Sequence, residues 1–175
     1  MRDVRANYIS AFKRHFARLK AEGQDVHAEV RVEYGAPKRH ELYRLAVVDV
    51  IKKDAEGKVA ATSIVTSPIV ADCIGLPIRS PIAWPAVTFR CNPADFPEAD
   101  VVAWGNRWIH DEDPPLGPQD GLTGIIHFVG QPELNEGLLE FEVDFGSAPL
   151  EAFQELSNVL GDSIEAVVTY EIGDT

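Results

Sequence analysis

The sequence predicts an α+β fold: a mixed, largely antiparallel sheet of about six strands, with an N-terminal and a C-terminal helix on one face. Three patterns predict it. An apolar stripe of helical spacing opens the chain, strictly alternating segments follow it, and a strand, a helix and a strand close it. The 175 residues suffice for a single domain with a substantial core. We divide this domain into residues 1–66, 67–121 and 122–175.

Residues 1–66 are typical of a helix followed by a three-stranded meander. Over residues 3–21 apolar side chains recur every three or four positions, and Asp3 is placed to cap this helix. Residues 26–34 then alternate, which predicts a strand whose odd-numbered side chains, Glu29 among them, face water. Two further strands are expected over residues 42–52 and 58–66.

Residues 67–121 have a different composition. The stretch from Pro68 to Pro118 holds nine of the twelve prolines, all three tryptophans and both cysteines. Such a density of proline argues against long helices and central strands, apart from a short strand near residues 86–90. We therefore expect an irregular segment across an edge or the open face of the sheet. It is either a functional element or a cover for the sheet, and the sequence leaves both open.

Residues 122–175 are regular again and predict a ββαβ unit. The strands are expected over residues 122–129, 138–145 and 164–172, and the helix over residues 149–160, capped by Ser147. A short crossover helix between two strands predicts that those strands run in the same direction.

Charge is distributed unevenly along the chain. Its net charge is −12, yet residues 1–20 carry six basic side chains and one acidic side chain. From residue 108 onward there are fifteen acidic side chains and no Lys or Arg. This balance disfavours nucleic acid and anionic membranes as partners and favours a basic protein. The alternative is that an acidic surface only keeps the protein soluble.

The apolar segments give an expectation about location. The longest uncharged run, residues 59–71, is too short to span a bilayer, and the N-terminal residues lack the unbroken apolar stretch of a secretory signal. We therefore expect a cytoplasmic protein without a membrane partner. Cys73 and Cys91 are expected to be reduced thiols.

The stretch WIHDEDPP, which begins at Trp108, places His110 beside three consecutive carboxylates, Asp111, Glu112 and Asp113. These are metal-ligand residue types, but adjacent side chains diverge and the spacing fits no zinc or calcium motif. We expect neither a metal nor a cofactor.

Four side chains are candidates for acid–base or nucleophilic chemistry. Asp49 lies within an apolar run, His127 lies within a predicted strand, and His110 and Cys91 carry reactive groups. Each also has a structural interpretation, as a hydrogen-bonded core residue or an exposed loop residue.

These observations favour a non-catalytic, acidic interaction module of the immunity or inhibitor type that binds a basic protein. Trp104 and Trp108 would anchor the partner beside Asp111, Glu112 and Asp113. The alternative is a small-molecule-binding domain or enzyme with a pocket under residues 67–121 that uses Asp49, Cys91, His110 or His127. Homo-oligomerisation through the tryptophan-bearing segment is compatible with either hypothesis.

Overall fold

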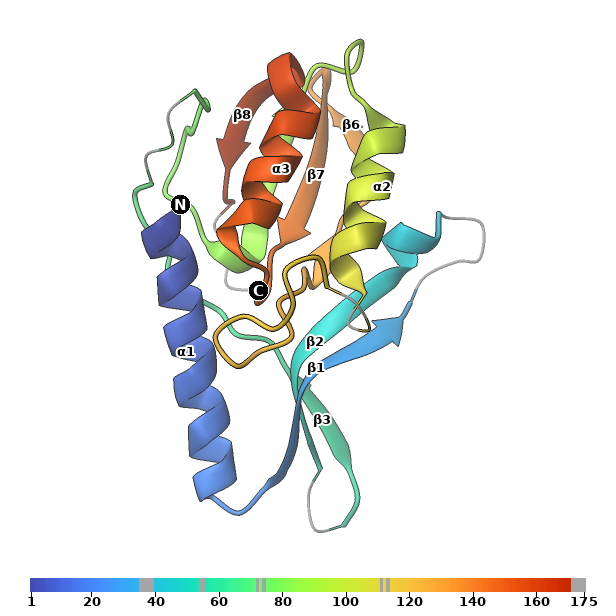
Figure 1. Cartoon of the computed structure of the whole chain (residues 1–175). Helices are drawn as coiled ribbons and strands as arrows, with labels where there is room; N and C mark the ends of the chain where they lie inside the picture. The colour runs from blue at the N-terminus through green and yellow to red at the C-terminus, as the bar shows by residue number, and fades with distance from the viewer. Residues whose placement is uncertain are drawn as a thin grey trace.

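The computed structural model describes residues 1–34, 40–53, 56–71, 73, 75–110, 112 and 114–170 (Figure 1). Its elements, in chain order, are α1 (Arg2–Ala21), β1 (Asp25–Glu33), η1 (Glu41–Arg44), β2 (Leu45–Lys53), β3 (Val59–Thr62), η2 (Trp84–Ala86), β4 (Val87–Cys91), α2 (Glu98–Ile109), β5 (Phe128–Val129), β6 (Glu133–Asn135), β7 (Leu138–Asp144), α3 (Leu150–Leu160), η3 (Gly161–Ser163) and β8 (Ile164–Val168). None of the helices in these ranges is long and apolar enough to cross a membrane.

The strands form one sheet in the order β1-β2-β5-β7-β4-β8, with β3 paired to β2 and β6 paired to β7. Every pairing between these strands is antiparallel. The predicted α+β class, with a helix near each end of the chain and a largely antiparallel sheet, is confirmed. β7 and β8 lie on either side of β4 and both run antiparallel to it, so they run in the same direction, as the strand–helix–strand pattern predicts.

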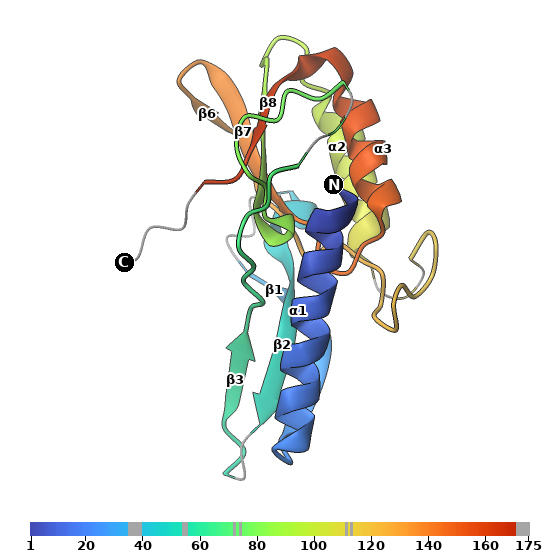
Figure 2. The same cartoon turned by 90° about the vertical axis from the view of Figure 1, so that its left-hand side faces the viewer.

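The three helices cover one face of the sheet and leave the other face open (Figure 2). Under α2 and α3 the core is aromatic: the ring centroids of Trp84 and Phe145 are 4.8 Å apart, and those of Phe145 and Phe153 are 5.5 Å apart. Because side chains alternate along β7, Phe141 and Val143 are buried beneath the helices, and their neighbours project to the open face.

The short strand predicted near residues 86–90 is present as β4, but it is a central strand between β7 and β8, a position that the proline density argued against. The irregular structure predicted for the rest of residues 67–121 is wrong at α2, which is a helix of twelve residues. The prolines interrupt neither element, because Pro85 precedes β4 and Pro97 is the N-cap of α2, a position where its missing N–H costs nothing. Part of the segment does follow an edge of the sheet, since Ile78 forms a bridge with Val167 of β8.

The strand predicted over residues 122–129 is also shorter than expected. Only Phe128 and Val129 form β5. His127 before them still bonds to both neighbouring strands, since its N–H donates to the Asp144 carbonyl and its carbonyl accepts from the N–H of Val47, but backbone groups further upstream have other partners. The N–H groups of Gly124 and Ile125, for example, both donate to the hydroxyl of Ser147. Ser147 belongs to the network described next.

Candidate functional site

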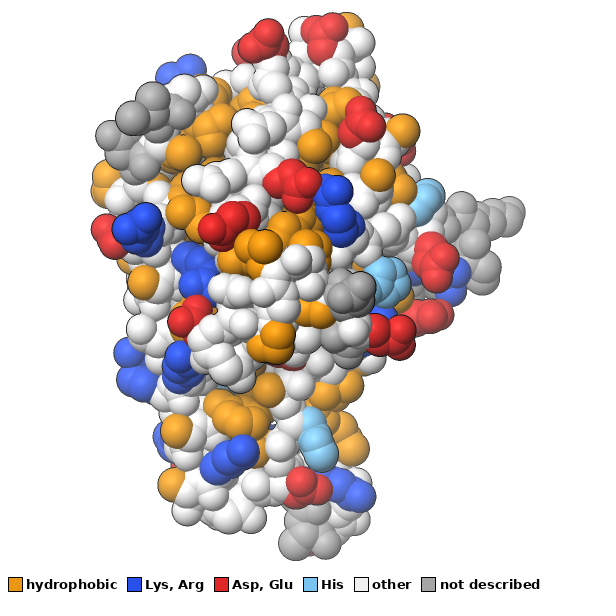
Figure 3. Space-filling model, viewed as in Figure 1, with side chains coloured by type: hydrophobic (Ala, Val, Ile, Leu, Met, Phe, Trp, Pro, Cys, Tyr) orange, Lys and Arg blue, Asp and Glu red, His pale blue; other side chains and the backbone are white. Residues whose placement is uncertain are grey.

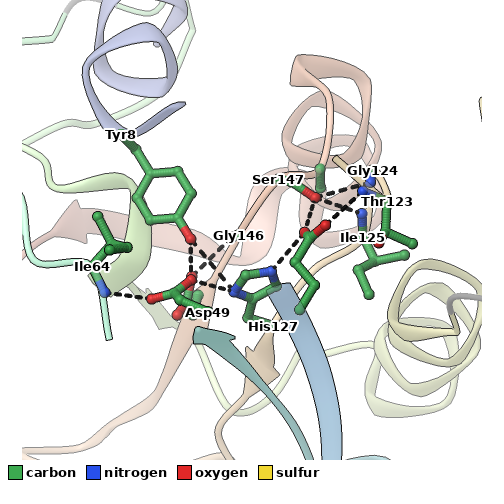
Figure 4. A network of polar contacts seen from close by, with 12 residues as sticks. Tyr8, Asp49, Ile64, Thr123, Gly124, Ile125, His127, Gly146 and Ser147 are labelled. Carbon is green, nitrogen blue, oxygen red and sulfur yellow. Dashed lines mark hydrogen bonds and ion pairs between the residues drawn. The ribbon is translucent and has the colours of Figure 1, made fainter. Parts of the chain in front are cut away.

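A network of charged and polar side chains is buried where α1, β1, β2 and β5 meet (Figure 4). Its centre is the imidazole of His127, which is fully buried and lies between two buried carboxylates, Glu29 and Asp49. His127 Nε2 is 3.1 Å from Glu29 Oε1, and His127 Nδ1 is 2.9 Å from Asp49 Oδ1. Because each ring nitrogen faces a carboxylate oxygen, both must carry a proton, and the side chain is an imidazolium.

The pKa values agree with this geometry. The desolvation of His127 lowers its pKa, but hydrogen bonds to Asp49 and Glu29 outweigh that effect and raise the pKa to about 10. The desolvation of Glu29 raises its own pKa, yet its bonds to His127 and Ser147 leave the pKa below the ordinary value. The two pKa shifts point the same way, toward an ion pair that persists at neutral pH.

Further donors complete the hydrogen bonding of both carboxylates. Asp49 accepts from the hydroxyl of Tyr8 in α1 and from the backbone N–H of Ile64. Glu29 accepts from the hydroxyl of Ser147 and, at 2.6 Å, from the backbone N–H of Thr123. Each carboxylate thus accepts three hydrogen bonds, which meets the requirement that a buried charge be both paired and hydrogen-bonded.

Two members of the network differ from their predicted roles. Ser147 was expected to cap α3, but that helix begins at Leu150 with Pro149 as its N-cap, and the Ser147 hydroxyl donates to Glu29 instead. Glu29 was expected to face water, but it is only 6% exposed. Its φ is +51°, a left-handed conformation in which the alternation of a regular strand no longer applies.

Of the four candidate chemical residues, the structure brings only Asp49 and His127 together. Cys91 is buried in β4, where desolvation raises the pKa of its thiol to about 11 and keeps it protonated at neutral pH. His110 is exposed at the C-terminal end of α2, where its Nδ1 lies 3.0 Å from Nη1 of Arg31. Cys73 and Cys91 are both free cysteines.

The tryptophans expected to anchor a partner lie in the core, which corrects that prediction. Trp104 is 1% exposed and Trp108 is 3% exposed. Both are on the buried face of α2, four residues apart, and their indole N–H groups donate to the Ala152 carbonyl and the Glu155 carboxylate. A side chain that anchors a partner is exposed to solvent in the free protein and becomes buried on binding, whereas these rings are already buried.

The acidic patch predicted beside them is described in part. Glu112 is exposed, whereas Asp111 and Asp113 lie outside the described residues. Elsewhere, acidic side chains of the C-terminal half pair with arginines of the same chain: Arg5 with Asp120, Arg90 with Glu140 and Arg107 with Glu155. The charge asymmetry of the sequence is therefore partly neutralised within the fold.

Two clefts adjoin each other on the open face of the sheet. The first has a volume of about 700 Å³, and its lining includes Glu142 and Asp144 of β7 together with residues 63–68 and Pro85. The second, of about 600 Å³, shares Glu142 and Tyr170 with the first and extends toward β6. We call the two together the open-face trough.

Asp144 connects the trough with the buried network. Its side chain is half-buried and lines the first cleft, one of its oxygens accepts from the N–H of Gly146 at 2.8 Å, and its backbone carbonyl accepts from the N–H of His127. Desolvation raises the pKa of Asp144 to about 7, against the opposing effect of the His127 charge. Partial burial also raises the pKa of Glu142.

The chemistry of these groups follows from their exposure. The side chains of Tyr8, Glu29, Asp49, His127 and Ser147 line neither cleft and use their hydrogen-bonding groups within the network, which suits a structural role. In the described ranges, no group of three or more His, Cys, Asp or Glu side chains is arranged to hold a metal ion. The trough instead presents carboxylates to solvent, and carboxylates bind cationic groups.

Comparison with known proteins adds no family to this description. No protein-family model matches the chain, and neither a curated protein nor a solved structure is significantly similar to it. The function must therefore be argued from the chemistry of the trough and of the network.

Proposed function

We propose that this protein is a non-catalytic binding module, of the immunity or inhibitor type, that takes a basic partner in its open-face trough. The proposal keeps the basic protein expected from the charge of the sequence and changes the surface that binds it. In place of the tryptophans and the three acidic residues at positions 111–113, the contact surface is the open face of β7 and its neighbours.

One observation carries the proposal: in the described ranges, every charged side chain that lines the trough is acidic. Glu133, Glu140, Glu142 and Asp144 line it, and within the described residues no Lys, Arg or His does. Arg90 lies nearby, but Glu140 and Glu136 already pair with it. A concave surface lined by charge of one sign concentrates ligands of the opposite sign.

The helix-covered face is less suited to a basic partner. On the side drawn in Figure 3, Lys and Arg side chains gather along α1, and acidic side chains are scattered among apolar and polar ones. The exposed basic residues of α1 are Arg2, Lys13, Arg14, Arg18 and Lys20. A basic protein approaching that face would meet like charge, which weakens association.

The alternative of an enzyme with a pocket beside residues 67–121 receives less support. Pro68, Ala83 and Pro85 of that segment do form part of the first cleft. However, none of its expected chemical residues, Asp49, Cys91, His110 and His127, lines either cleft. The proposal includes a cytoplasmic location and no nucleic-acid partner, in keeping with the free cysteines and the acidic charge.

The test measures the affinity of fluorescein-labelled hexalysine, a stand-in for a basic segment, by fluorescence anisotropy. The test variant is E142Q/D144N, which removes two charges from the trough. The matched control is E151Q/D162N, which removes two charges from exposed residues of α3 and η3. We expect the first variant to weaken binding about tenfold and the control less than twofold, because contacts between charged groups contribute most at close range.

Two results would contradict the proposal. Equal weakening in both variants would mean that hexalysine responds to net charge and not to the trough. Binding that does not weaken when salt is raised from 50 to 300 mM would also argue against it, since exposed charges are screened over about 10 Å at 0.1 M salt.

A further inference from the structure

Residues 63–68, which we call the strap, continue the chain from β3 (Figure 2), and all of them line the trough. From Ser63 to Ser67 the residues alternate between exposed and buried, as in an extended strand. The buried members are Ile64 and Thr66, and Val65 between them is 70% exposed. The strap is held from inside by the N–H of Ile64, which donates to the buried carboxylate of Asp49.

Among the described residues, no other strand pairs with the outer edge of the strap. The ladder between β2 and β3 ends at Thr62, and in the described part of the chain the backbone N–H and C=O groups of Val65 bond to nothing. In an extended chain successive amides point to opposite edges. Since the N–H of Ile64 points inward to Asp49, the N–H of Val65 points outward.

An unpaired strand edge beside a concave surface is the geometry at which a peptide adds as a further strand. The trough supplies the room, with the strap as one wall, the side chains of β7 as the floor, and Thr169 and Tyr170 as the opposite wall. The carboxylates of Glu142 and Asp144 on that floor favour a positively charged peptide.

We propose that the basic partner binds through an extended segment whose backbone pairs with the strap and whose Lys or Arg side chains contact Glu142 and Asp144. This inference rests on the proposed function and adds the form that the partner takes at the site. Charge complementarity identifies the occupant: an acidic segment would be repelled by the floor, and a neutral one would leave two partly desolvated carboxylates without a counter-charge.

The experiment uses the labelled peptide Lys-Val-Lys-Val-Lys-Val with blocked ends, and two twins of it. One twin carries N-methyl groups on its valine amides and the other on its lysine amides, so each loses the hydrogen-bond donors of one edge and keeps every charge. Because a strand pairs through one edge, we expect one twin to bind about tenfold more weakly and the other to bind like the parent peptide.

Two protein variants test the same contact from the other side. V65P removes the outward N–H of the strap, and V70P places proline at another exposed valine, which does not line the trough. We expect V65P to bind the parent peptide at least fivefold more weakly and V70P to bind it unchanged. Circular dichroism checks that both variants fold. If V65P does not fold, the binding of the two N-methylated peptides to the wild-type protein still tests whether a strand pairs with the strap.

The outcomes separate the two proposals. If both twins bind like the parent while E142Q/D144N weakens all three, strand addition is wrong and the acidic trough stands as the binding surface. If neither hexalysine nor the parent peptide binds, the proposed function fails as well. If the protein dimerises in size-exclusion chromatography with mass measurement and V65P abolishes the dimer, the strap pairs with a second copy, and the inference about a basic partner is overturned.

Discussion

Replacing His127 with glutamine should destabilise the protein strongly, because it removes the cation between two buried carboxylates. Glutamine keeps the approximate size and some hydrogen bonding of the imidazole, so the main loss is the charge. Glu29 and Asp49, at 6% and 2% exposure, would then face each other without a counter-ion. Removing one partner of a buried ion pair typically costs about 3–5 kcal/mol.

The pKa of His127 gives an independent value for the stability lost when this residue is replaced. A rise from 6.5 to about 10 means that the folded state holds this proton more tightly than the unfolded chain by roughly 5 kcal/mol. The two figures agree, and either is a large part of the roughly 5–15 kcal/mol by which domains are usually stable. We therefore expect H127Q to lose about 3–5 kcal/mol in its free energy of unfolding.

The sign of the pH dependence follows from the same shift. Because the folded pKa lies above the unfolded value, the contribution is complete below pH 6.5 and is lost as pH rises toward 10. The free energy of unfolding of the wild-type protein should fall by about 2.5 kcal/mol between pH 7 and pH 9. In H127Q the part of this decline that comes from the imidazole should be absent.

Urea denaturation followed by circular dichroism at pH 7, 8 and 9 measures both quantities. The control is H110Q, which removes an exposed imidazole that contacts Arg31 and should change stability by less than about 0.5 kcal/mol. If H127Q is too unstable to purify, adding E29Q should restore part of the loss, since one unpaired buried charge then disappears. A wild-type stability that is flat from pH 7 to 9, or a loss below 1 kcal/mol in H127Q, would refute the buried ion pair.

Two further predictions concern the surroundings of His127. Gly146 has a φ of +47°, and a Cβ there would lie 2.1 Å from the His127 ring, so G146A should cost about 2–4 kcal/mol by urea denaturation. The control G137A, at φ +84° in open space, should cost about 1 kcal/mol; equal losses would mean that backbone strain alone is measured. Because the pKa of Asp144 is about 7, its ionised fraction rises about tenfold from pH 6 to pH 8, and hexalysine affinity should rise with it by up to that factor. The D144N variant should show no such rise in the same anisotropy titration.

Hydrophobic periodicity correctly predicted those helices and strands whose structure follows from residues close together in the sequence. The stripe over residues 3–21 became α1 with Val4, Tyr8 and Phe12 buried, and the alternation over residues 138–145 became β7. The number of prolines led to a wrong prediction at α2 because it took no account of where in the segment the prolines lie. The sixteen residues between Pro97 and Pro114 hold no proline, and α2 begins at the start of that interval.

The network was out of reach of sequence patterns for a different reason. A charge inside an apolar run marked Asp49, and an imidazole inside a strand marked His127. Nothing marked Glu29, which occupies a water-facing position in the alternation and is buried through a left-handed φ that its residue type does not favour. Nor did spacing connect these residues with Ser147, since their contacts span 98 and 118 positions of the chain.

The buried network also influences the charge of the trough. The imidazolium of His127 lowers the pKa of Asp144, whereas desolvation, Asp49 and Glu142 raise it. Without the His127 charge, Asp144 would keep its proton to a higher pH, and the floor of the trough would carry less negative charge at neutral pH. The ion pair that holds α1, β1 and β2 together is therefore also what allows a half-buried carboxylate to bind a cation. A protein that lost His127 but still folded should bind basic peptides more weakly without any change in the trough itself.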